Sequence, residues 1–177
     1  MRMCDPKNRL VDHRVVLTTL ALLALTACTA SRPTSTGPST AGHDIVITRR
    51  EAQQTTVGPA ENFTGTAHVQ RLFLPTSPSR VQGAYVTFEP GAHTAWHTHP
   101  AGQILVVTAG SGYVQQWGGQ RLDLHEGDVV WTPPNVKHWH GATPTSAMTH
   151  MAIVEQLDGK SAEWMEKTTD AQYAGGP

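Results

Sequence analysis

The sequence has little charge, only two cysteines and no long apolar run after residue 27. Both cysteines, Cys4 and Cys28, lie near the N-terminus, so residues 29–177 contain no thiol and no disulfide framework can hold that part together. Charged residues make up 15% of the chain and the formal net charge is -1, without a run of basic side chains, which argues against a nucleic-acid partner. With 16 glycines and 12 prolines between short apolar segments, the chain favours many short strands over long helices.

Residues 1–27 have the outline of a signal peptide. Four basic residues precede the apolar run VVLTTLALLALTA at 15–27, which is shorter than the roughly 20 residues of a membrane-spanning helix. The run ends in Leu-Thr-Ala-Cys, which resembles the lipobox of bacterial lipoproteins, in which the cysteine is diacylated after cleavage. The resemblance implies a lipid anchor at Cys28 and an extracytoplasmic protein attached to the bacterial cell membrane. The alternative is a chance cysteine that follows an ordinary secretory signal.

Two further segments follow the signal. Residues 28–42 consist almost wholly of Ser, Thr, Pro, Gly and Ala after the cysteine, and this composition predicts a disordered tether. Residues 43–177 are predicted to form one folded domain, since this length can bury a single core. From Cys28 onward the chain has 9 basic and 12 acidic residues, so 9 − 12 leaves a net charge of -3 and no electrostatic attraction to anionic lipid.

The domain is predicted to be all-β. Short alternating or apolar segments are typical of strands, with glycines, Gly110 among them, at the turns between them. About eight strands at this spacing suit a jelly-roll β-barrel with a pocket at one mouth. Residues 157–173 are expected to form a short C-terminal helix. The predicted strands cover 45–48, 67–73, 81–88, 104–108, 112–117, 121–124, 128–132 and 147–155.

Histidines cluster in one part of this domain and indicate a metal site. His97 and His99 in WHTHP lie two residues apart on a strand and therefore face the same side, and Gln103 shares their parity. His138 in KHWHG comes from a separate segment and completes a shell of three nitrogens and one oxygen. The alternatives are that His97 and His99 are polar residues of a barrel interior, that Gln103 only bonds the backbone, and that His138 is no ligand.

The same residues carry a resemblance to a known family. Gly91, His97, His99, Gln103 and Gly110 match the first motif of the cupins, and Gly127, Pro133 and His138 match the second. Longer stretches are similar to the bacterial manganese-dependent hydroxynitrile lyase-like cupins, over residues 62–173.

This resemblance implies a single-domain cupin with one divalent metal bound by His97, His99, Gln103 and His138. Manganese is favoured by the resemblance, while the ligand types also suit iron, zinc or nickel. His140 and His150 are expected beside the metal as catalytic groups, although His140 could instead be structural. The substrate pocket is expected to include Ala84, Val86 and Val154. The chain departs from these relatives at two positions, where His93 replaces an arginine and Val154 replaces a glutamine.

A neutral shell of three histidines and one glutamine leaves the charge of a divalent metal uncompensated. Such a metal stabilises alkoxides and enolates, and an imidazole can move a proton near neutral pH. We therefore expect a lyase that acts on a small carbonyl-derived substrate, with cyanohydrin cleavage or synthesis as the named case. The alternatives are a dioxygenase or oxidoreductase acting on a small aromatic or enolic compound, and a non-catalytic lipoprotein that binds a metal or small ligand. Homo-oligomers are common among cupins, but the sequence offers no count of subunits.

Overall fold

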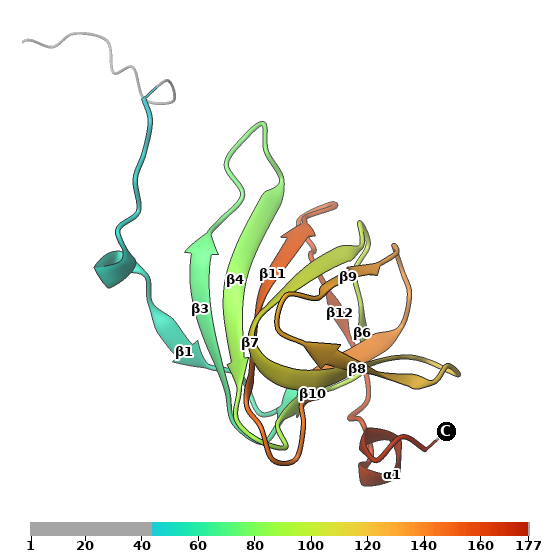
Figure 1. Ribbon diagram of the computed structural model, residues 1–177. Helices are drawn as coiled ribbons and strands as arrows, with labels where there is room; N and C mark the ends of the chain where they lie inside the picture. The colour runs from blue at the N-terminus through green and yellow to red at the C-terminus, as the bar shows by residue number, and fades with distance from the viewer. Residues whose placement is uncertain (1–43, 177) are drawn as a thin grey trace, which may run out of the picture. The chain divides into compact units, whose positions relative to one another are not determined.

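The computed structural model describes residues 44–176, so the predictions made for residues 1–27, for the tether at 28–42 and for the lipid anchor at Cys28 lie outside the described residues. The described part is built from antiparallel strands with one very short helix, which confirms the all-β jelly-roll prediction (Figure 1). No helix within residues 44–176 has the length and apolar character needed to cross a membrane.

The strands lie in the order β1-β3-β4-β11-β7-β10-β5-β2, with β6, β8, β9 and β12 attached at the side of this path. Their bounds are β1 Thr55–Val57, β2 Phe63–Thr64, β3 Ala67–Phe73, β4 Val81–Phe88, β5 His93–Thr94, β6 His97–Thr98, β7 Gln103–Gln116, β8 Arg121–His125, β9 Val129–Thr132, β10 His138–Ala142, β11 Met148–Glu155 and β12 Glu163–Trp164, and the helices are the 3-10 turn η1 Arg50–Ala52 and α1 Asp170–Tyr173. In Figure 1 β3, β4 and β11 lie side by side, and β7 curves away from them towards β8 and β10.

The long strand β7 joins the two halves of the barrel. Its first part pairs with β11 and β9, and its second part pairs with β10 and β8. The register with β11 shifts between Thr149 and His150, which marks a β-bulge, and Gly110 follows with a φ of 75°. A Cβ at Gly110 would lie 1.9 Å from the carbonyl oxygen of Ala147, so only glycine fits where the strand bends. The predicted turn at Gly110 is therefore wrong: the segments 104–108 and 112–117 form one continuous strand.

One other predicted element is wrong, and the predicted C-terminal helix is confirmed but is much shorter than expected. The apolar segment 45–48 forms no strand, and its Ile45 and Val46 side chains are exposed, because it pairs with no neighbouring strand. Of the predicted helix at 157–173 only α1 exists. The middle of the segment 157–173 forms β12 instead, in which Trp164 pairs with His97. The backbone of the residues that follow β12 hydrogen-bonds the backbone of Trp96. Tertiary pairing along β6 thus overrides the local helical preference.

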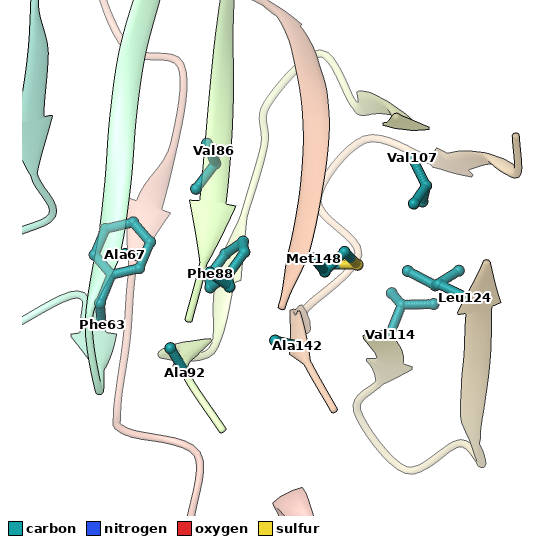
Figure 2. Close-up of a cluster of buried hydrophobic side chains, with 10 residues drawn as sticks. All are labelled: Phe63, Ala67, Val86, Phe88, Ala92, Val107, Val114, Leu124, Ala142 and Met148. Carbon is teal, nitrogen blue, oxygen red and sulfur yellow. The ribbon is translucent and has the colours of Figure 1, made fainter. Parts of the chain in front are cut away.

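The hydrophobic core lies between the two halves of the barrel. Alternate residues of β3, β4 and β11 face inward, which is why Ala67, Phe88 and Met148 are fully buried. Side chains from β7 and β8 meet them from the other half. Figure 2 shows the cluster, which consists of Phe63, Ala67, Val86, Phe88, Ala92, Val107, Val114, Leu124, Ala142 and Met148. This core fixes the inner surface on which the histidines lie.

Candidate metal centre and pocket

Five histidines converge inside the barrel. His97 lies on β6, His99 follows that strand, His138 and His140 lie on β10, and His150 lies on β11, with exposed fractions of 5% or less. The register pairs His138 with His97, so these two rings lie only 4.3 Å apart between centroids. Further ring pairs link His97 to His99 at 5.1 Å and His140 to His150 at 4.8 Å. The β-pairing of distant segments therefore creates the cluster that the HxH spacing only suggested.

Hydrogen bonds fix how three of these rings present their nitrogens. Nδ1 of His97 donates to the carbonyl of Ala95 at 3.0 Å, and Nδ1 of His138 donates to that of Val136 at 3.0 Å. Nδ1 of His99 likewise donates to the carbonyl of Ser161. A neutral imidazole that carries its proton on Nδ1 has its lone pair on Nε2. Each ring is thus held in the tautomer that a metal ligand requires.

Burial keeps these imidazoles neutral. Burial lowers the pKa of His99, and it lowers the pKa of His138 to about 4. It also holds the pKa of His97 well below the usual 6.5, and the neighbouring histidines lower the pKa of His97 further. Burial is also the first cause of the lowered pKa at His140 and at His150, where the pKa falls to about 3. All five rings therefore keep a free lone pair at neutral pH.

The donor set fits a divalent metal. Ligand nitrogens of His97, His138 and His140 lie within 4.8 Å of one another, so three buried histidines could bind one ion. Nε2 of His99 is buried and has no hydrogen-bond partner within the described residues. Nε2 of His138 lies 3.1 Å from Oε1 of Gln103, so two lone-pair atoms face each other. An imidazole nitrogen and an amide oxygen are both ligand types for a divalent metal, so His138 and Gln103 could hold one ion together.

A cavity of about 480 Å³ opens beside these residues. His99 and Gln103 form part of its wall, and so do two of the three predicted pocket residues, Ala84 and Val154. The third, Val86, does not line this cavity: its side chain is 8% exposed and packs in the hydrophobic core next to His150. The remaining lining residues are Val69, Arg71, Phe73, Leu74, Gln82, Gly83, Ala152, Gln156, Ser161, Ala162 and Trp164.

Two residues of this region escaped the sequence analysis. Trp164 stacks at a tilt on His97, with 4.6 Å between ring centroids, because β12 pairs with β6. Arg71 lines the cavity from β3. The alternation of β3 places Arg71 on the same face as Ala67 and Val69, at the end of that face where the side chain is exposed, so its parity with buried residues was the available signal.

His140, a member of the three-histidine cluster, and His150 both pack against the core. Phe88 contacts both, with ring centroids 5.7 Å from His140 and 5.6 Å from His150. Nδ1 of His140 and both nitrogens of His150 are buried without a hydrogen-bond partner within the described residues. Neither ring is among the residues that line the cavity, and the unpartnered nitrogens are what make the two histidines candidates for proton transfer.

Comparison with known proteins agrees with this architecture. The cupin domain profile matches residues 84–154. A curated (R)-mandelonitrile lyase from Granulicella tundricola is 58% identical over 127 residues, which cover 72% of this chain and 97% of that protein. The chain therefore belongs to the cupin family.

Solved structures show the same fold. A cupin-like protein from Thermotoga maritima is 43% identical, with a TM-score of 0.62 over 67% of this chain and 90% of that one. A cupin-2 domain from Rhodospirillum rubrum is 18% identical, with a TM-score of 0.57 over 73% of this chain and 84% of that one. The second likeness concerns the fold alone.

Proposed function

We propose that this protein is a metal-dependent lyase that cleaves and forms cyanohydrins. The observation that carries the proposal is the 58% identity to a curated (R)-mandelonitrile lyase along 97% of that protein's length. The buried histidine cluster beside a cavity supports it, because such a reaction needs both a charge-stabilising centre and a proton acceptor.

In this proposal His97, His99, Gln103 and His138 hold one divalent metal. The Nδ1 hydrogen bonds of the three histidines and the contact between His138 and Gln103 support the assignment. His140 also lies close enough to be a ligand, so a ligand-by-ligand test must include it. Manganese is the proposed metal on the family resemblance, with iron, zinc and nickel as the competitors that elemental analysis would detect.

The proposed reaction breaks the bond between the carbinol carbon and the nitrile carbon. The bound metal would supply a Lewis acid for the substrate oxygen. A neutral imidazole, His140 or His150, accepts the hydroxyl proton as the electron pair of the breaking bond leaves with cyanide. The same imidazole then returns the proton to cyanide, so the products are an aldehyde and hydrogen cyanide. Because burial disfavours the charged imidazolium, the return of the proton is favourable.

The test uses purified protein of known metal content. Cleavage of (R)-mandelonitrile and its synthesis from benzaldehyde and cyanide are measured for the native chain and for His97→Ala, His140→Ala and His150→Ala. His125→Ala is the matched control, because the side chain of His125 is 72% exposed. The proposal expects turnover that His97→Ala and His150→Ala abolish and His125→Ala retains. Metal binding without turnover, or oxygen consumption with an aromatic or enolic substrate instead, would contradict it.

Attachment to the bacterial cell membrane through a lipid on Cys28 is a separate proposal, supported by the Leu-Thr-Ala-Cys motif. Labelling of the full chain with a radioactive fatty acid in a bacterial host tests it. The proposal expects labelled native chain in the membrane fraction and no label in Cys28→Ser.

A further inference from the structure

On the inner face of the sheet formed by β3, β4 and β11, one set of directly paired residues combines a charged side chain with two very small ones. The register pairs Arg71 with Ala84, and Ala84 with Ala152. These three residues therefore form one row across three strands, and two of them have almost no side chain. The next row towards the core contains Val69, Val86 and His150, so the alanine row lies directly above a proposed catalytic histidine. The small alanines leave open the space that the cavity occupies.

Arg71 is the only charged residue among those described that line this cavity. No ion pair or hydrogen bond of its side chain occurs within residues 44–176, in contrast to Arg80, whose Nη2 lies 3.1 Å from a carboxylate oxygen of Glu155. The amides of Gln82 and Gln156 in the same wall bond to each other at 3.3 Å. Arg71 is thus an exposed residue with no acidic partner among those described, and the other side chains that line the cavity are apolar or neutral.

We propose that Arg71 binds a carboxylate on the substrate, at the end away from the reacting carbon. The chemistry at the reacting carbon depends on the proposed lyase function. The carboxylate contact depends only on the position of Arg71 in the cavity. Arg71 on β3 is separated from His150 on β11 by two strand spacings across the sheet and two residues along the strand. With about 4.8 Å between neighbouring strands and a rise of about 3.3 Å per residue, their Cα atoms are about 12 Å apart. The cavity that Arg71 lines together with Ala84 and Ala152 has a volume of about 480 Å³, which is enough for a ligand the size of one ring. The substrate class is therefore a small aldehyde or cyanohydrin that carries an acid group.

The chemistry of both ends of the cavity favours such an anion. A guanidinium matches a carboxylate with two parallel hydrogen bonds. At the other end, the histidine and glutamine side chains that would hold a metal are neutral and leave its positive charge uncompensated. A neutral substrate would leave the charge of Arg71 without a counter-charge.

The first experiment measures binding without the reaction. Isothermal titration of chelator-treated protein with benzoate and with benzamide compares a carboxylate with a neutral molecule of the same shape. We expect the affinity ratio of benzoate to benzamide to fall about tenfold in Arg71→Gln, the order of magnitude for one lost charge-assisted bond at a partly exposed site. Arg80→Gln is the matched control and should keep the ratio. An unchanged ratio in Arg71→Gln would overturn the proposal.

The second experiment uses the metal-loaded chain. The cyanohydrin of 4-formylbenzoate is compared with mandelonitrile, and the ratio of their kcat/KM values should fall about tenfold in Arg71→Gln and stay constant in Arg80→Gln. Absence of turnover with either substrate would refute the lyase proposal, while the titration would still decide the role of Arg71. If Arg71→Gln unfolds, Arg71→Lys retains the charge but not the bidentate geometry, and an intermediate ratio is then expected.

Discussion

Replacing His150 by leucine should stabilise the metal-free protein while abolishing the proposed lyase activity. His150 is fully buried, both of its ring nitrogens lack a hydrogen-bond partner within the described residues, and its neighbours include Phe88 and Val107. A buried polar group without a partner costs about 1–3 kcal/mol, and leucine has a similar size without the polar atoms. Allowing for imperfect packing of the new side chain, we expect the free energy of unfolding to rise by about 1–2 kcal/mol.

Thermal and urea unfolding of chelator-treated protein measure this change. For a domain of this size, 1 kcal/mol corresponds to about 3–5 °C in Tm, so the expected rise is about 3–10 °C. Met148→Leu is the matched control, since Met148 lies two residues earlier on the same face and is equally buried, and its Tm should change little. The reasoning is refuted if His150→Leu keeps the native circular dichroism spectrum but unfolds several degrees below the native chain.

Three further predictions follow from the same contacts. Adding a divalent metal at 100 times its Kd should raise the free energy of unfolding of the native chain by about 2.7 kcal/mol and leave the Tm of His97→Ala unchanged in a thermal scan. An equal rise of Tm in the native chain and in His97→Ala would show that the metal binds at another site. Gly141→Ala should destabilise the fold by about 3 kcal/mol or more, because a Cβ there would lie 2.4 Å from Cβ of His93 and 2.6 Å from the carbonyl oxygen of Ala92; a near-native urea midpoint would contradict this. Burial lowers the pKa of His93, so the folded state favours the neutral ring. The contribution of His93 to stability is therefore complete above about pH 6.5 and is lost as the pH falls below that value. His93→Phe should therefore flatten the fall of Tm between pH 6.5 and 5, and an unchanged slope would refute this role.

The C-terminal segment explains why His93 is important for the fold. The ring of His93 stacks on Tyr173 with 4.4 Å between ring centroids. The hydroxyl of Tyr173 donates to the carbonyl of Ala142 at 2.8 Å. Arg121 donates to the carbonyl of Tyr173, and this bond also ties α1 to β8. The chain thus uses an aromatic stack to hold its last turn. His93 therefore packs against the C-terminal segment and does not line the cavity.

Local patterns predicted much of the fold. The strands 67–73 and 81–88 follow from alternation alone, because one face of each is buried and the period of two is visible in the sequence. The same period placed His97 and His99 together. Local patterns failed at Gly110 and at residues 157–173, where the deciding partners, Ala147 and β6, are distant in the sequence.

The sequence by itself determined the strand-rich class, the cupin resemblance and the residue types of a candidate metal site, since these depend on composition, period and spacing. Only the tertiary structure decided which side chains meet. The pairing of β10 with β6 brings His138 to His97, backbone carbonyls select the ring tautomers, and the alanine row opens a cavity to Arg71. These contacts join residues far apart in the chain, so no local pattern contains them.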